Sequence, residues 1–320
     1  MPFQPPAWLR NRHAQTLWAY LAQPAPSVTY HRESISTPDG DEVDLDWSFG
    51  EAGGPAVLIC HGLEGNSDSP YVRRLVARAN SRGWTAAVLH SRTCSGRPNR
   101  RVASYHSGYI TDLQHVCPLV AQRLGERPLY LVGYSLGGSL VANYLGRCVD
   151  EVPGNVRGAF LCSAPLNLAP GAEALREGFN RVYELKFLLS LRKKVMEKGR
   201  AHQAWRSAAE AAARVRSLRD FDETWTAPVH GFIDAEDYYK KASAAPHLRA
   251  IQVPTRVLHA DDDPFIIDAC VPVDDLRAAA SVTYTPTKHG GHVGFVSQSS
   301  PWWLEDEILD WLYRRARPLV

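Results

Sequence analysis

The chain has 320 residues, of which 45% are hydrophobic and 22% are charged, the proportions of an ordinary globular protein. Its 36 Lys and Arg residues are nearly balanced by 34 Asp and Glu residues, and the net charge of +2 gives no basis for a nucleic-acid partner. No stretch approaches the roughly 20 apolar residues of a membrane span, so we expect no stable membrane insertion. The length suits one large domain, and we expect residues 1–320 to form a single domain.

The N-terminus and the cysteines indicate the compartment. Residues 1–6 contain no charged segment followed by an apolar one, so no signal peptide is expected. None of the six cysteines forms a C-x-x-C pair, and we expect reduced thiols and a cytoplasmic location. The histidines show no metal-ligand spacing such as H-E-x-x-H, and we expect neither a metal nor a cofactor. No pattern in the chain indicates an oligomeric state.

The first half of the chain predicts strands that alternate with helices. Residues 1–27 are rich in Pro and Trp and are expected to form an irregular arm. Two alternating runs predict an antiparallel pair of strands joined by a turn at Pro38-Asp39-Gly40. In order, we expect strands 28–36, 43–49 and 56–60, helix 70–82, strand 85–89, helix 112–124, strand 129–132, helix 136–147 and strand 156–162.

The second half of the chain opens with a long helical block. Residues 170 to about 245 lack strand patterns, and we interpret 166–245 as a helical cap or lid insertion, not a separate domain. Strand patterns return at 255–259 and 281–285, and a final helix is expected over 301–315. Strands that alternate with helices predict an α/β fold, with a mainly parallel sheet covered by helices on both faces.

The most informative motif is Gly133-Tyr134-Ser135-Leu136-Gly137, which stands between a predicted strand and a predicted helix. A G-x-S-x-G sequence in this context is typical of the nucleophile elbow of α/β-hydrolases. Small residues on either side of the serine permit the sharp turn that exposes its hydroxyl. The motif therefore predicts an α/β-hydrolase fold with Ser135 as the nucleophile.

An acid and a histidine should follow the serine along the chain, because triad residues of this fold come in the order Ser, Asp or Glu, His. The strand 255–259 is followed by three adjacent aspartates, and all three are candidates for the acid. We favour Asp263 over Asp262 and Asp261, because the proline after it would stiffen the turn that presents it.

Two histidines after the last predicted strand compete for the role of base. We favour His292 over His289, because His292 lies between glycines that leave room for its ring beside the serine. Phe295, three residues further on, is expected to shield that ring.

The oxyanion hole should use one amide after the nucleophile and one from the loop after an early strand. The first is the backbone N–H of Leu136, and the second is assigned to Leu63 in His61-Gly62-Leu63-Glu64-Gly65. His61 could serve as a base or a ligand, but we expect it to hold the loop by hydrogen bonds.

Three further clusters have an ordinary structural explanation beside a functional one. Asp237-Tyr238-Tyr239 could bind a polar substrate, although packing at a lid hinge is the simpler interpretation. The run Arg192-Lys193-Lys194 is expected to be a solvated helix face, and Trp8 and Trp18 of the arm are expected to pack rather than touch a membrane. Apolar residues of the helical block could line an acyl pocket or form its own core: Phe179, Phe187, Leu188, Leu189 and Trp205.

Taken together, the chain resembles the YheT-like esterases of the α/β-hydrolase superfamily (AB-hydrolase family 4). That group also holds eukaryotic abhydrolase-domain lipases and yeast medium-chain ester acyltransferases. The resemblance runs nearly end to end and is carried by Gln15-Thr16-Leu17, "HGLEGNSDSPYVRRL" from His61, Cys94-Ser95-Gly96, "GYSLGGSLVANYLG" from Gly133, "TAPVHGF" from Thr226, Asp237-Tyr238-Tyr239, Asp262-Asp263-Pro264-Phe265 and "GGHVGF" from Gly290. One departure is Thr93, where the family commonly has glycine.

The resemblance implies a serine hydrolase that acts on medium-chain or lipid-like acyl esters through a triad of Ser135, Asp263 and His292. The expected partner is therefore a small-molecule acyl ester, converted through an acyl-enzyme intermediate. An acyltransferase that passes the acyl group to an alcohol would use the same residues and is the main alternative. A non-catalytic binding protein on a hydrolase fold is the second alternative.

Overall fold

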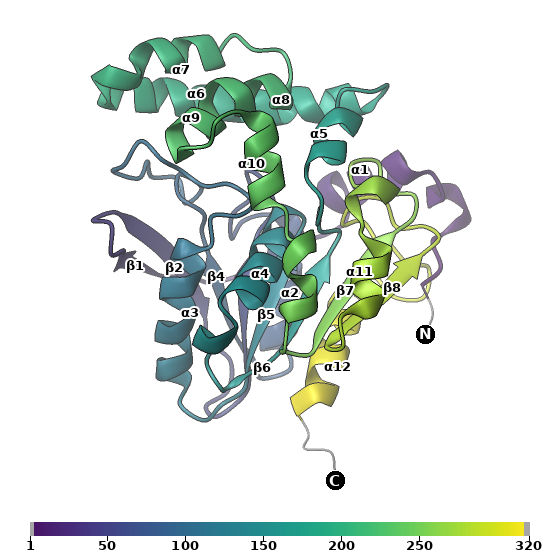
Figure 1. Cartoon of the computed structure of the whole chain (residues 1–320). Helices are drawn as coiled ribbons and strands as arrows, with labels where there is room; N and C mark the ends of the chain where they lie inside the picture. The colour runs from purple at the N-terminus through teal and green to yellow at the C-terminus, as the bar shows by residue number, and fades with distance from the viewer. Residues whose placement is uncertain (1–2, 317–320) are drawn as a thin grey trace.

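The computed structural model describes residues 3–316 and shows one twisted sheet with helices on both faces (Figure 1). The eight strands lie in the order β1-β2-β4-β3-β5-β6-β7-β8. The pairs β1–β2 and β2–β4 are antiparallel, and every pair from β4 to β8 is parallel. The predicted α/β class with a mainly parallel sheet is therefore confirmed.

The elements agree with the predicted order within a few residues at most of their ends. The strands are β1 (His31–Ser36), β2 (Glu42–Ser48), β3 (Ala56–Cys60), β4 (Thr85–Leu89), β5 (Leu129–Tyr134), β6 (Val156–Cys162), β7 (Thr255–Ala260) and β8 (Val282–Thr287). The helices around the sheet are η1 (Ala7–Leu9), α1 (Arg12–Leu21), α2 (Pro70–Asn80), α3 (Thr111–Leu124), α4 (Leu136–Arg147), η2 (Val149–Glu151), η6 (Asp268–Cys270), α11 (Val273–Ala278) and α12 (Trp303–Ala316).

The core lies in two layers because the side chains of each strand alternate between the faces of the sheet. On one face, Leu58 of β3 belongs to a cluster with residues of α3, α4 and α11. On the other face, Val57 and Ile59 of the same strand pack in a cluster with residues of α2 and α12. Every residue of β3 is buried, as its continuous apolar run predicts.

Two elements differ from the sequence predictions. The arm 1–27 is not irregular throughout, since it contains η1 and the ten-residue helix α1. The Asn11 side chain caps α1 by accepting hydrogen bonds from the backbone N–H groups of His13 and Ala14. The short helix α11 was not predicted.

Residues 166–245, which we call the helical segment, lie between β6 and β7 at the top of Figure 1. They have a small apolar core of their own, which includes Leu188 and Trp225. The segment contains α5 (Ala169–Ala174), α6 (Asn180–Ala201), η3 (Gln203–Trp205), α7 (Arg206–Ala212), α8 (Leu218–Phe221), the π-helix η4 (Asp222–Thr226), α9 (Ala227–His230), α10 (Ala235–Ala242) and the start of η5 (Ala245–Ala250).

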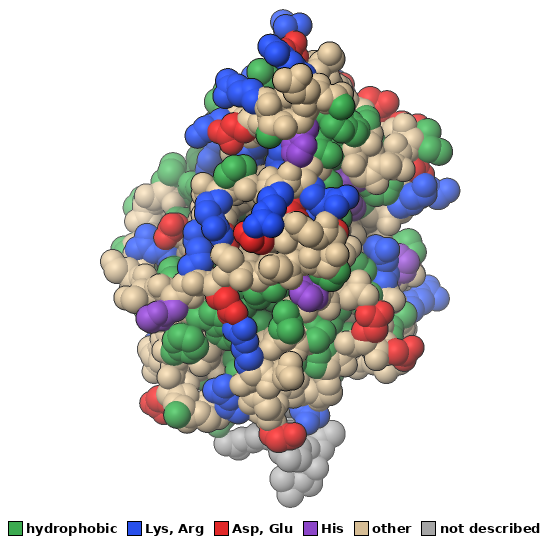
Figure 2. Space-filling view, turned by 90° about the vertical axis from the view of Figure 1, so that its left-hand side faces the viewer, with side chains coloured by type: hydrophobic (Ala, Val, Ile, Leu, Met, Phe, Trp, Pro, Cys, Tyr) green, Lys and Arg blue, Asp and Glu red, His purple; other side chains and the backbone are tan. Residues whose placement is uncertain are grey.

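The surface carries charges of both signs. On the face that holds β1 and β2, Lys and Arg side chains are scattered among Asp and Glu (Figure 2). Ion pairs such as Arg100–Glu42 and Arg123–Glu33 join basic to acidic side chains.

All six cysteines are buried free thiols. Within residues 3–316, no helix combines the length and the apolar character needed to cross a membrane.

Candidate active site

Ser135 lies at the turn between β5 and α4, where the backbone takes an unusual conformation. Its φ of 51° falls in the left-handed region, which is rare for a residue with a side chain. A Cβ on Gly133 would lie 2.5 Å from the carbonyl oxygen of Gly137, and a Cβ on Gly137 would lie 2.2 Å from that of Cys60. The two glycines therefore allow α4 to start directly against the ends of β3 and β5, with Ser135 at its N-terminus.

His292 joins Ser135 to Asp263. The Nε2 atom of His292 lies 2.9 Å from Oγ of Ser135, and its Nδ1 atom lies 2.9 Å from Oδ2 of Asp263. The Asp263 side chain is fully buried, and its Oδ1 atom accepts hydrogen bonds from the backbone N–H groups of Phe265 and Ile266. Such an arrangement can move a proton from the hydroxyl to the imidazole while the carboxylate orients the ring.

Asp262 and His289, the competing candidates for acid and base, are not part of the hydrogen bonds that link Ser135, His292 and Asp263. Asp262 accepts a hydrogen bond from the backbone N–H of Gly291 at 2.8 Å and lies 3.2 Å from Nδ1 of His289. Asp261 is exposed. Over residues 3–316, neither Asp262 nor His289 has a hydrogen bond to Ser135.

The aromatic ring beside His292 is Phe265, whose centroid lies 4.4 Å from that of the imidazole. Phe295 instead packs against Phe3 and Trp303, with centroid distances of 5.5 and 6.0 Å. The expectation that Phe295 shields His292 is therefore wrong. The backbone bends at Phe295, where φ is 42°, and its side chain enters the core.

The loop after β3 approaches Ser135 closely, since a Cβ on Gly62 would lie 3.2 Å from Cβ of Ser135. Leu63 and Leu136 line the same pocket as Ser135. Among the hydrogen bonds of residues 3–316, none is donated by the backbone N–H of Leu63 or of Leu136. Amides without an internal partner beside a serine can bind an oxygen atom of a substrate.

The His61 ring holds this loop in place. Its Nδ1 atom lies 2.8 Å from the carbonyl oxygen of Gly62, and its Nε2 atom accepts a hydrogen bond from the backbone N–H of Ser91 at 3.1 Å. Burial lowers the pKa of His61 to about 3, so the ring is neutral near pH 7. Both ring nitrogens are therefore occupied by backbone groups, in agreement with the structural role expected for His61.

Comparison with known proteins places the chain in a family. Residues 55–298 match the family described as the alpha/beta hydrolase fold. The chain belongs to the α/β-hydrolase family. It is 38% identical over 317 residues to a protein of Escherichia coli K12 named "Putative esterase YheT", and the match covers 97% of this chain and 92% of the relative. The resemblance to YheT-like esterases is confirmed.

More distant matches agree with this assignment. The human protein named Phospholipase ABHD3 is 26% identical over 302 residues, which cover 92% of this chain and 73% of the relative. The solved Pyrococcus furiosus esterase Pf2001 shares the fold with a TM-score of 0.59 at 15% identity, over 90% of this chain and 91% of that one. This α/β-hydrolase is therefore an enzyme of the esterase and lipase type.

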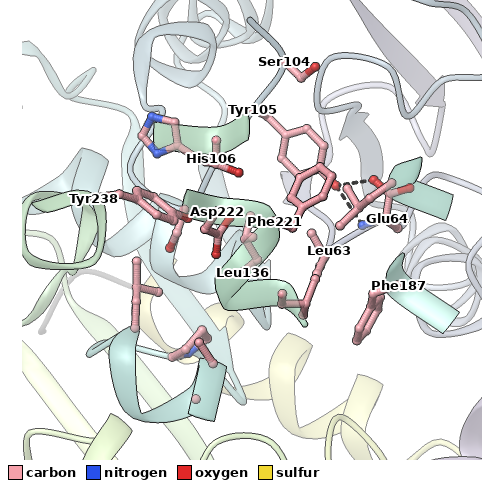
Figure 3. A pocket seen from close by; sticks show the side chains of 18 of the residues that line it. Leu63, Glu64, Ser104, Tyr105, His106, Leu136, Phe187, Phe221, Asp222 and Tyr238 are labelled. Carbon is pink, nitrogen blue, oxygen red and sulfur yellow. Dashed lines mark hydrogen bonds between the residues drawn. The ribbon is translucent and has the colours of Figure 1, made fainter. Parts of the chain in front are cut away.

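In this α/β-hydrolase, a pocket is lined by Ser135, by His292 and by residues of the helical segment. Figure 3 shows this pocket, with Leu63, Leu136 and Phe187 among the labelled residues. Of the five apolar residues considered for an acyl pocket, Phe187 lines it. Leu188 and Trp205 pack within the helical segment, whereas Phe179 and Leu189 are exposed. Apolar side chains that line it include Leu175, Phe187, Leu191, Val195, Leu218, Phe221 and Trp225.

Lys194 is not part of a solvated helix face, contrary to the sequence interpretation. Its Nζ atom lies 2.8 Å from Oε1 of Glu64, the residue directly after Leu63. The Tyr105 hydroxyl donates to the same carboxylate at 2.8 Å, and the Ser190 hydroxyl donates to its other oxygen. Residues of α6 therefore tie the helical segment to the loop that carries Leu63.

Side chains of the N-terminal helix α1 form hydrogen bonds to the loop that carries His292. The sequence did not predict this contact. Thr16 Oγ1 accepts a hydrogen bond from the backbone N–H of His292 at 2.9 Å. The fully buried Gln15 side chain accepts from the Val296 N–H at 2.8 Å and donates to the Val296 carbonyl oxygen at 3.1 Å. Trp8 and Trp18 of the arm contact each other and remain exposed.

Thr93, the departure noted in the sequence, has a backbone conformation that glycine adopts more easily. Its φ is 71°, in the left-handed region that a β-branched residue seldom adopts. Thr93 also lines the pocket. The substitution therefore changes the backbone preference of a turn beside the pocket and removes none of the candidate catalytic groups.

Proposed function

We propose that this α/β-hydrolase cleaves carboxylic esters with Ser135 as nucleophile, His292 as general base and acid, and Asp263 as the group that orients His292. The observation that carries this proposal is the pair of 2.9 Å contacts that link the three side chains. Ser135 attacks the ester carbonyl carbon as His292 takes its proton, and the alcohol then leaves with that proton. Water attacks the acyl-enzyme in the second half of the reaction, and Ser135 regains its hydrogen.

The amides of Leu63 and Leu136 are proposed to bind the negative oxygen that develops during attack. Support comes from their place beside Ser135 and from the absence, within residues 3–316, of another acceptor for either N–H. Donors that are already in place gain interaction energy as charge develops, which is the usual source of a large rate effect.

The helical segment is proposed to act as a cap over the site, and its apolar side chains as the acyl pocket. Support comes from residues of α5, α6 and α8 that line the pocket beside Ser135. An apolar lining favours a medium-chain or lipid-like acyl group, since each buried CH₂ contributes about 0.8 kcal/mol.

The proposal is tested by rates of hydrolysis of p-nitrophenyl esters from acetate to palmitate. We expect kcat/KM to rise with chain length up to a middle length and then to fall as the pocket is filled. A fluorophosphonate probe should label the enzyme at Ser135, as read by mass spectrometry of peptides. No turnover of any ester, together with no labelling of Ser135, would overturn the proposal. Adding ethanol and measuring ethyl esters tests the acyltransferase alternative.

The hydrogen bond between Thr16 of α1 and the backbone of His292 gives a further prediction. We expect Thr16→Val to lower kcat about tenfold with little change in KM, because His292 loses a contact that fixes its position. Thr16→Ser keeps the hydroxyl oxygen and should retain most of the activity. The two variants are compared on p-nitrophenyl octanoate, and full activity in Thr16→Val with a loss in Thr16→Ser would show that Thr16 acts through packing alone.

A further inference from the structure

Exposed apolar side chains are concentrated on two segments of the chain. Among residues 3–316, twelve large apolar side chains are exposed, and eight of them lie within residues 8–21 and 179–189. Single exposed apolar residues are ordinary on a protein surface. A group of them beside polar residues usually marks a surface that binds a partner or a membrane.

The members on α6 form one stripe along the helix. Val182, Leu185 and Leu189 are spaced three and four residues apart, which places them on one side of α6, and Phe179 continues the stripe just before the helix starts. The other side of α6 lines the pocket, through residues such as Phe187. The helix therefore has two apolar sides, one toward the pocket and one toward solvent.

The N-terminal arm extends this stripe. The Lys186 ammonium on α6 lies 3.7 Å from the centre of the Tyr20 ring, and the rings of His13 and Phe179 lie 4.7 Å apart. The exposed apolar residues of the arm are Trp8, Trp18, Tyr20 and Leu21. We call the exposed apolar side chains of residues 8–21 and 179–189 the apolar patch.

The exposed charges of these two segments are all positive. Residues 1–32 contain no Asp or Glu, and residues 178–196 contain only Glu184. Glu184 is buried and accepts a hydrogen bond from the backbone N–H of Leu218 at 2.8 Å. The exposed basic residues beside the patch are Arg10, Arg12, Arg181, Lys186 and Lys193. An anionic surface is therefore complementary to both segments.

The combination fits a lipid surface better than a protein. In a helix that lies on a membrane, apolar side chains enter the boundary between headgroups and acyl chains, while Lys and Arg stay at the level of the phosphates. Trp and Tyr are enriched at the same depth. Protein interfaces are instead depleted of Lys, whereas Lys186 lies inside the patch, against Tyr20.

We infer that the apolar patch binds the surface of a membrane that contains anionic lipids, with α6 and the N-terminal arm against the bilayer. Binding of this kind is peripheral and requires no helix that crosses the membrane. It does not depend on the proposed ester hydrolysis, because the stripe lies on the side of α6 away from the pocket.

Co-sedimentation with vesicles tests the inference. The lipids are diethers, which contain no ester bond: dialkyl phosphatidylcholine alone, or mixed with about one third dialkyl phosphatidylglycerol. The enzyme should bind the mixed vesicles about fivefold or more tightly than the neutral ones, the value of one basic residue near an anionic surface. Raising the salt concentration to about 0.5 M should reduce this difference, since salt screens the attraction.

Two variants locate the binding surface. Leu185→Asp and Lys186→Glu should each weaken binding to the mixed vesicles about fivefold or more. Ile233→Asp and Arg206→Glu are the matched controls and should bind like the wild type. Ile233 is 84% exposed and the Arg206 side chain is 71% exposed, and both belong to the helical segment but not to the patch.

Two further measurements separate this inference from the proposed function. Ser135→Ala should bind the mixed vesicles as tightly as the wild type, and Leu185→Asp should hydrolyse soluble p-nitrophenyl acetate at the wild-type rate. Equal binding to neutral and anionic vesicles, or equal losses in the patch variants and their controls, would overturn the inference. No binding to either vesicle would also overturn it and would leave a protein as the occupant of the patch.

Discussion

Replacing Ser135 by alanine is expected to lower kcat on p-nitrophenyl octanoate by about 10⁴- to 10⁶-fold, the range found when a triad nucleophile is removed. The variant loses the atom that attacks the ester, while the amides of Leu63 and Leu136 and the acyl pocket remain. We therefore expect KM to change little. Initial rates measured at high enzyme concentration, with a circular dichroism spectrum to confirm folding, check this result.

A matched variant removes a buried serine in the first turn of α4, four residues after Ser135. Ser139 donates a hydrogen bond to the carbonyl oxygen of Pro165 at 2.5 Å, and Ser139→Ala should keep activity within a few fold. The acid can be tested in the same assay, because Asp263→Asn should cost about 10⁴-fold and Asp262→Asn far less. An active Ser135→Ala enzyme would contradict the proposed mechanism.

The elbow and the order of its partners could be predicted because each depends on local sequence. Gly133 and Gly137 reveal the turn around Ser135, since any side chain at either position would overlap backbone atoms. The rule that acid and histidine follow late strands then reduced the search to Asp261–Asp263 and two histidines. Only the structure distinguishes Asp263 from Asp262 and His292 from His289. The Asp263–His292 pair is hydrogen-bonded to Ser135, whereas Asp262 and His289 contact each other.

The contacts that surround these residues could not be predicted, because they join segments far apart in the chain. Thr16 and His292 are 276 positions apart, and Glu64 and Lys194 are 130 apart. The sequence shows each residue as an unremarkable polar group on a helix or a loop.

Arg92 lies at the centre of a buried cluster of charges, and its replacement should have a large effect on stability. Its guanidinium is fully buried and bonds to Asp39, Asp41 and Asp112. Burial alone would lower the pKa of Arg92, but the hydrogen bonds to Asp112 and Asp39 outweigh it and raise the pKa. We expect Arg92→Met to lower the free energy of unfolding by about 3–5 kcal/mol, because buried carboxylates are left without a partner.

The pH dependence of Arg92→Met distinguishes lost charge pairing from lost packing. Burial raises the pKa of Asp112, and removing Arg92 should raise it further. A carboxyl group with a raised folded pKa binds a proton more tightly in the folded state than in the unfolded state. Stability therefore falls as pH rises through that interval.

The loss of stability in Arg92→Met should consequently be smaller at pH 5.5 than at pH 7.5, as measured by urea denaturation at both values. Arg100→Met is the control, since the Arg100 side chain is 66% exposed and forms a surface pair with Glu42. Its effect should stay within about 0.5 kcal/mol at either pH. A loss in Arg92→Met that is equal at the two pH values would mean that Arg92 stabilises the loop around Thr93 by packing, not by charge.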